Sequence, residues 1–144
     1  MNAKEYLNQV YRIDNRINSL VLELDDLRSR ADSIGGSSFG DKVQSSPKND
    51  AGFVNSVLKI IELENYISSQ IDKLIDLKKE ISAAIDEVQN IDEKVLLRYR
   101  YINCLSWEAI AEQMGYSTRQ IHRIHGNALR DFERCHTMSL NVTV

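Results

Sequence analysis

The sequence predicts an all-α protein: a long antiparallel helical hairpin of coiled-coil type, followed by a small helix-turn-helix domain. Two long stretches that repeat apolar residues at alternating steps of three and four predict the arms of the hairpin. Two short amphipathic stretches that meet at Gly115 predict the small domain. We therefore expect a hairpin over residues 1–90, a helix-turn-helix domain over residues 91–136, and a frayed or loosely docked tail over residues 137–144.

The two arms of the hairpin are separated by a segment of different composition. The first arm is expected over about Ala3–Ala31, where the heptad spacing holds and neither Gly nor Pro intervenes. The second is expected over about Phe53–Gln89, with the polar residues Glu64 and Lys78 interrupting its seam. Between them, residues 32–52 hold four of the six glycines and the only proline. We expect a loop there, much of it mobile.

The second arm has a wider apolar stripe than one partner helix can cover. Burial of apolar surface is worth about 25 cal/mol per Å², so leaving this stripe in water forgoes several kcal/mol. We therefore expect hairpins from two chains to pair into a homodimer through these N-terminal helices. A lone hairpin that packs back on the C-terminal domain is the alternative. The residues that widen the stripe are Val54, Ile61, Leu63, Ile75 and Leu77.

The small domain is expected to hold three helices. Asp92 can cap the first of them, from which Arg98 and Arg100 would point away from the core. Ser106 is a good N-cap for the second, and Gly115 can take the positive φ that ends it. Ser117 and Gln120 can form a capping box at the start of the third. The core of the domain is expected to contain Val95, Leu96, Tyr99, Ile110, Ala111, Met114, Ile121, Ile124, Ala128, Leu129 and Phe132.

The stretch from Leu105 to Phe132 resembles a helix-turn-helix DNA-binding motif. Ala111 stands where that motif has a small residue at the crossing of its helices, and Gly115 follows four residues later at the turn. The joint match in a two-helix pattern is fairly specific. The five buried positions of the motif are taken by Ile110, Met114, Tyr116, Ile121 and Ile124.

The wider stretch from Ile91 to Phe132 resembles region 4 of sigma-70-type factors. It is still more similar to phage-encoded late transcriptional regulators of the RinA and ArpU type, through Ser117-x-Arg119-Gln120-Ile121-x-Arg123-Ile124-His125-Gly126. Sigma region 4 usually has a leucine where His125 stands, and we expect Ile124 to take the buried role instead. The resemblance implies a transcriptional regulator of phage or prophage type, whose partner is double-stranded DNA.

In a helix-turn-helix the second helix lies in the major groove, and its N-terminal half faces the base edges. Arg can make a bidentate contact to guanine, and Ser or Thr can contact bases or phosphates. Arg130, Arg98 and Arg100 are secondary candidates for contacts to the DNA backbone. The residues expected on the DNA-facing side are Ser117, Thr118, Arg119, His122, Arg123 and Asn127.

Charge and cysteine usage fit this interpretation. Residues 1–90 hold 11 Lys and Arg against 15 Asp and Glu, whereas residues 91–144 hold 7 against 6, with all three histidines. The C-terminal part is therefore the one expected to approach phosphates. Two cysteines without a C-x-x-C motif, no signal peptide and no long apolar run predict a cytoplasmic protein away from membranes. The resemblance to phage regulators implies that this cytoplasm is that of a bacterial host cell.

Catalytic and metal sites find little support in the sequence. It has no glycine-rich phosphate loop, no H-E-x-x-H and no nucleophile elbow, so we expect neither an enzyme nor a cofactor. A zinc set of His122, His125, Cys135 and His136 is conceivable from spacing, but His122 belongs to the DNA-facing side. We therefore expect no metal, and histidines that contact phosphate or solvent.

Two other functions remain open. A small terminase-like packaging subunit also couples a helix-turn-helix to oligomerising helices, and it would form a ring of many subunits with a partner ATPase. An adaptor would use the hairpin to bind a protein such as RNA polymerase, with only weak DNA binding. Measurement of the oligomer's mass separates the ring from the dimer, and salt-sensitive binding without sequence preference would favour the adaptor.

Overall fold

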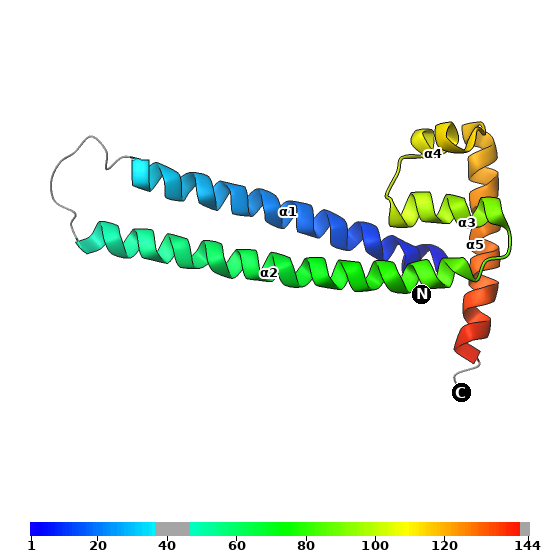
Figure 1. Ribbon diagram of the computed structural model, residues 1–144, viewed down its shortest axis with the longest axis horizontal. Coiled ribbons are helices and arrows are strands. Elements are labelled where there is room, and N and C mark those ends of the chain that lie inside the picture. The colour runs from blue at the N-terminus through cyan, green and yellow to red at the C-terminus, as the bar shows by residue number, and fades with distance from the viewer. Residues whose placement is uncertain (37–46, 142–144) are drawn as a thin grey trace. The chain divides into compact units, whose positions relative to one another are not determined.

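The structure, a computed structural model, describes residues 1–36 and 47–141. Within these residues every regular element is helical, which confirms the all-α class (Figure 1). None of the described helices combines the length and the apolar character that a membrane crossing requires. The elements are α1 (Ala3–Gly36), α2 (Pro47–Asp86), α3 (Ile91–Leu97), the π-helical turn η2 (Arg98–Ile102), α4 (Trp107–Met114) and α5 (Thr118–Asn141).

Three helix ends lie beyond their expected positions. α1 continues to Gly36 and α2 begins at Pro47, so the loop expected over residues 32–52 was wrong at both ends. Its remainder, residues 37–46, lies outside the described residues. α5 continues to Asn141, so the tail expected from residue 137 is helical up to there. The reason is that adding a residue to a formed helix costs far less than nucleating one, so weak helix formers extend existing ends.

The chain divides into two compact units. One comprises Met1–Ile13 with Leu74–Val144, and the other comprises Asp14–Lys73. The division runs through both long helices, whereas the sequence suggested a boundary near residue 90. The difference arises because the start of α1 and the end of α2 pack with the C-terminal helices.

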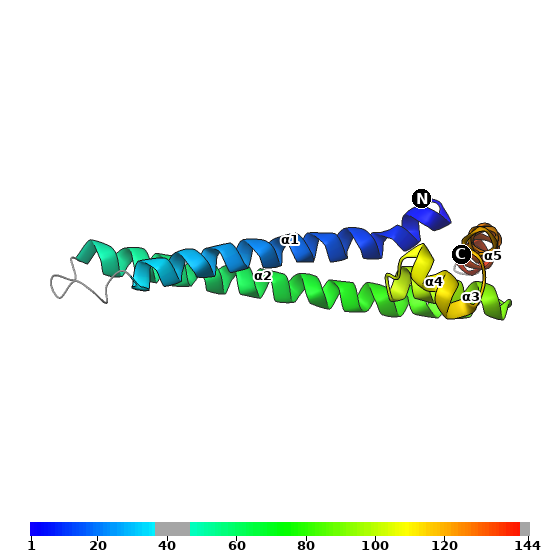
Figure 2. The same cartoon turned by 90° about the horizontal axis from the view of Figure 1, so that it is seen from above.

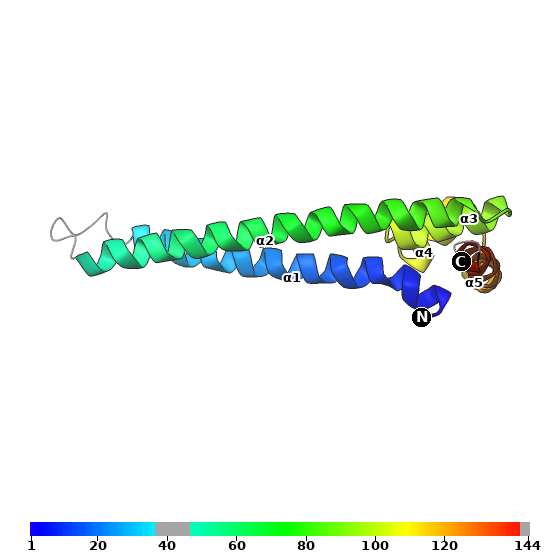
Figure 3. The same cartoon turned by 90° about the horizontal axis from the view of Figure 1, so that it is seen from below.

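In the unit Asp14–Lys73, the α1 and α2 stretches lie side by side and run in opposite directions (Figures 2 and 3). Ile17, Leu24 and Ala31 are buried at the heptad spacing of α1. Polar contacts between described side chains also join the helices. Arg16 donates to the Tyr66 hydroxyl, and Arg28 pairs with Glu64 at 2.7 Å. Glu64, which interrupts the expected seam, therefore has a partner on the neighbouring helix.

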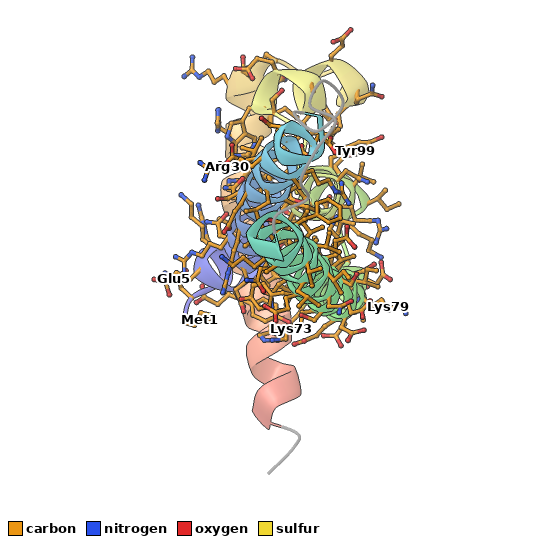
Figure 4. The ribbon with its side chains drawn as sticks, turned by 90° about the vertical axis from the view of Figure 1, so that its left-hand side faces the viewer. Met1, Glu5, Arg30, Lys73, Lys79 and Tyr99 are labelled. Carbon is orange, nitrogen blue, oxygen red and sulfur yellow. The ribbon has the colours of Figure 1, made fainter. Side chains whose placement is uncertain are left out.

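In the unit of Met1–Ile13 and Leu74–Val144, α5 passes both α3 and α4 and is seen almost end-on in Figure 2. Leu96, Ile110 and Ile121, one from each of these helices, form a fully buried cluster. The exposed side chains of Glu5 and Lys79 extend outward from α1 and α2 (Figure 4). The other fully buried large side chains of this unit are Leu7, Val10, Ile81, Ile85, Val88, Leu97, Tyr101 and Phe132.

Candidate nucleic-acid interface

Both ends of α4 carry the capping residues that the sequence predicts. At the start of α4, the Ser106 hydroxyl accepts a hydrogen bond from the Ala109 N–H at 3.2 Å. At its end, Gly115 takes φ 71°, and its N–H donates to the Ala111 carbonyl. A Cβ at Gly115 would meet nothing within 4 Å, so the backbone conformation alone selects glycine. Both sequence predictions are confirmed, and the turn at Gly115 sets the direction in which α5 leaves.

The start of α5 carries the expected capping box. The Ser117 N–H donates to Gln120 Oε1 at 3.0 Å, and the Gln120 N–H donates to Ser117 Oγ at 3.2 Å. The first N–H groups of a helix have no partner within it. Because the box satisfies those of Ser117 and Gln120, the N–H groups of Thr118 and Arg119 remain to face solvent or an anion.

The two faces of α5 separate as the sequence predicts. Ile121, Ala128 and Phe132 are buried against the other helices. The guanidinium groups of Arg119 and Arg123 are on exposed residues, and no ion pair within the described part of the chain includes either. All six residues expected on the DNA-facing side are exposed: Ser117, Thr118, Arg119, His122, Arg123 and Asn127.

Two of the secondary candidates bind the protein itself. Arg98 Nη1 donates to Ser82 Oγ at 2.5 Å. Arg100 Nη1 donates to the Leu105 carbonyl at 2.9 Å, and its guanidinium lies over the Trp107 ring. Both side chains are half-buried, so the expectation that they point away from the core toward DNA was wrong. A guanidinium has five N–H donors and a flat face, so it can hydrogen-bond to acceptors within the protein and stack on aromatic rings. The spacing of residues in the sequence does not show such partners.

His125, and not Ile124, takes the buried position on α5. His125 is 8% exposed, whereas Ile124 is half-buried. The Tyr101 hydroxyl and His125 Nε2 form a hydrogen bond of 2.7 Å, which gives this ring nitrogen a partner inside the protein. Burial, together with the nearby cations Lys4 and Arg100, lowers the pKa of His125 to about 4. The expectation that His125 contacts phosphate or solvent is therefore wrong, because a tyrosine partner makes its burial acceptable.

The residues of the conceivable zinc set have separate contacts. The rings of His122 and His125 both pack on Trp107, with centroids 4.8 and 4.7 Å from that of the indole. The His136 ring stacks on Tyr6. Cys135 Sγ lies 3.6 Å from the Glu87 carbonyl. Within the described residues, no three His, Cys, Asp or Glu side chains converge as metal ligands do.

The cap of α3 differs from the expected one. Asn90 Oδ1 accepts from the Glu93 N–H at 3.1 Å, so Asn90, not Asp92, is the N-cap. Asp92 instead accepts a hydrogen bond of 2.8 Å from the hydroxyl of Tyr116, which follows the Gly115 turn. This bond raises the pKa of Tyr116. The Asn90 cap was foreseeable, since Asn and Asp are equally good N-caps, but the Tyr116–Asp92 bond depends on tertiary structure.

A buried carboxylate had no signal in the sequence. Glu93 on α3 is 7% exposed, and its Oε2 has no hydrogen-bond partner among the described residues. Burial, followed by the neighbouring carboxylate Asp131 on α5, raises the pKa of Glu93 to about 7. Glu93 belongs to the first turn of α3, where an acidic residue is ordinary, so its burial could not be read from the pattern.

The fold and this surface define an all-helical protein in which a glycine turn joins two helices and the second exposes arginines. The chain belongs to the DUF1492 family, described as a protein family of unknown function, which it matches over residues 35–133. This match covers more than half of the chain, from the end of α1 into α5. Comparison with curated proteins and with solved structures finds no match.

Proposed function

We propose that this protein is a sequence-specific DNA-binding transcriptional regulator of phage or prophage type, with the N-terminal half of α5 in the major groove. The observation that carries the proposal is the exposed face at the start of α5. There, Arg119 and Arg123 extend from a helix whose direction is fixed by a glycine turn, and neither has an internal ion-pair partner in the described residues.

This surface suits a duplex in three ways. The guanidinium groups of Arg119 and Arg123 can each make a bidentate contact to guanine O6 and N7. Thr118 and Asn127 are also exposed on α5 and add neutral hydrogen-bonding groups. The first N–H groups of α5 can bind a phosphate and fix the register on the backbone. A surface that binds only protein would not need these groups to lie together in the first turns of the helix after the Gly115 turn.

The phage assignment is supported by two observations of different kind. DUF1492 is a phage-associated family. Of the residues that carry the resemblance to phage late regulators, Thr118 to Gly126 lie on the continuous helix α5, and Ser117 caps its start. The finer assignment to the RinA and ArpU type is part of the proposal.

The proposed regulator acts as a homodimer, because residues 14–73 leave a long apolar stripe on α2 uncovered. Val54, Leu58 and Ile61 are 53%, 51% and 45% exposed, and their spacing of four and three places them along one side of the helix. One neighbouring helix already covers the adjacent face. A second copy offers the same stripe, so a two-fold interface is self-complementary. Two heads would then read half-sites about 34–36 Å apart, or a multiple of that.

Selection of duplexes from a random pool by the full chain tests the proposal. We expect enrichment of one motif, and for a dimer a repeated one, together with a mobility shift that a scrambled duplex does not reproduce. The matched control is Arg30→Ala, which removes an exposed arginine from α1 and leaves α5 intact. A selection that enriches no motif with the wild-type chain would overturn sequence-specific binding.

A further inference from the structure

Arg100 connects the start of α1 to the helix pair of the proposed interface. Its guanidinium carbon lies 4.2 Å from the centre of the Trp107 ring and 5.1 Å from that of Tyr11. Arg100 Nη1 donates to the Leu105 carbonyl at 2.9 Å, and the Tyr11 hydroxyl donates to the Arg100 carbonyl at 2.6 Å. These contacts hold both the side chain and the backbone of Arg100, so its guanidinium is not available on the exposed surface.

Trp107 passes this restraint on to α5. Its indole contacts the ring of His122 at 4.8 Å between centroids and the ring of His125 at 4.7 Å. His125 is itself fixed, since it is buried and bonded to Tyr101. His122 differs because it is exposed and lies among the arginines of the proposed DNA-facing side. The indole is therefore a platform that is held from within and supports one exposed imidazole.

We propose that Arg100 is a positioning residue for DNA recognition: acting through Trp107, it holds the His122 ring ready for the duplex. The DNA-binding part of this inference rests on the proposed function. A side chain ordered before binding loses less rotamer entropy when it makes its contact, which strengthens binding. A planar guanidinium can stack on an indole and still donate to a carbonyl, whereas an ammonium cannot reproduce that stacking. Arg100→Lys should therefore lose the positioning of the His122 ring, although it keeps the positive charge.

The first experiment examines the free protein. The chain has a single tryptophan, so its fluorescence reports on this cluster without interference from another indole. We expect Arg100→Lys to change the Trp107 emission and to shift the NMR signals of the His122 ring toward values of an unstacked imidazole. The matched control, Arg130→Lys on the exposed side of α5, should change neither. Unaltered His122 signals in Arg100→Lys, with the fold intact, would overturn the inference whether or not the protein binds DNA.

The second experiment measures affinity for the selected duplex at several salt concentrations. We expect Arg100→Lys and Arg100→Ala to weaken binding about 2- to 10-fold each, the range for ordering one side chain, with an unchanged salt slope. A direct phosphate contact would instead survive in Arg100→Lys, and Arg100→Ala would lower the slope by about one. That outcome would overturn the positioning role.

A double-mutant cycle then shows whether Arg100 acts through His122. In a His122→Ala background, Arg100→Lys should have little further effect on affinity, because the ring that it positions is gone. Additive losses would overturn the inference. Failure of the wild-type chain to bind any duplex would instead remove the proposed function, while the His122 signals of the free protein would still decide whether Arg100 positions that ring.

Discussion

Glu93 on α3 lies buried beside Asp131 on α5, and within the part of the chain that the structure describes Glu93 Oε2 has no hydrogen-bond partner. Two ionised carboxylates cannot donate to each other, so a proton on one of them is needed for a hydrogen bond between the pair. Arg134, which pairs with Asp131 at 3.5 Å, opposes this protonation only in part. The contact between α3 and α5 is therefore linked to pH.

Replacing Glu93 with Gln should stabilise the protein at and above neutral pH. The pKa of Glu93 is raised from 4.5 to about 7, so its contribution is fully present below pH 4.5 and is lost as pH rises through 7. Glu93→Gln removes the buried charge and supplies an amide donor for Asp131. We expect a gain of about 1–3 kcal/mol at pH 8 that disappears near pH 4.5. Urea unfolding at both pH values measures it, and the exposed Glu112→Gln should show no such difference.

His125 should destabilise the fold in acid. Its pKa is lowered from 6.5 to about 4, so the unfolded chain binds the proton more readily. Stability is therefore lost as pH falls from 6.5 toward 4. The double variant His125→Leu with Tyr101→Phe removes both partners of the buried hydrogen bond and should flatten this part of the stability curve. His122→Ala should keep the wild-type dependence of stability on pH. If that dependence is lost in His122→Ala, the acid effect does not come from His125.

The Gly115 turn should be sensitive to any side chain. Gly115→Ala is expected to cost about 1–2 kcal/mol, since an L residue at φ 71° is strained even with open space around its Cβ. Gly126→Ala is the matched control because it also meets nothing within 4 Å, but it lies inside α5. It should stabilise the protein by up to about 1 kcal/mol. Thermal unfolding of both variants measures these two changes in stability, which should have opposite signs. Changes of the same sign would contradict the role of Gly115 in the turn.

The α2 stripe should control self-association. Leu58→Glu with Ile61→Glu puts two charges into the proposed interface and should convert a dimer to a monomer. The control is Lys59→Glu, which changes charge on the same helix. Sedimentation at micromolar concentration measures both. A wild-type chain that sediments as a monomer, or a double variant that remains a dimer, would remove the homodimer from the proposal.

Patterns of spacing predicted the presence of the helices, the caps around the Gly115 turn and the two faces of α5, because those features depend on neighbours within a few residues. Ser106, Gly115 and the Ser117–Gln120 box are of this kind, and all are present. The exposed arginines follow from the same periodicity.

Contacts between distant segments were beyond such patterns. The ring of His125 is buried because Tyr101, 24 residues earlier, supplies its partner. Arg100 is held by Tyr11, a residue of the first helix. Even the division of the chain depends on these contacts, since Met1–Ile13 packs with the C-terminal helices. The spacing of residues in the sequence does not predict which distant residue a polar side chain will contact.

Titration of the selected duplex with Arg123→Ala tests the central claim most directly. Loss of one bidentate contact to guanine should cost about 1–3 kcal/mol and relax the preference at one base pair. Arg30→Ala on α1 should bind as the wild-type chain does. If Arg123→Ala keeps both the affinity and the sequence preference of the wild-type chain, the start of α5 is not the surface that reads DNA.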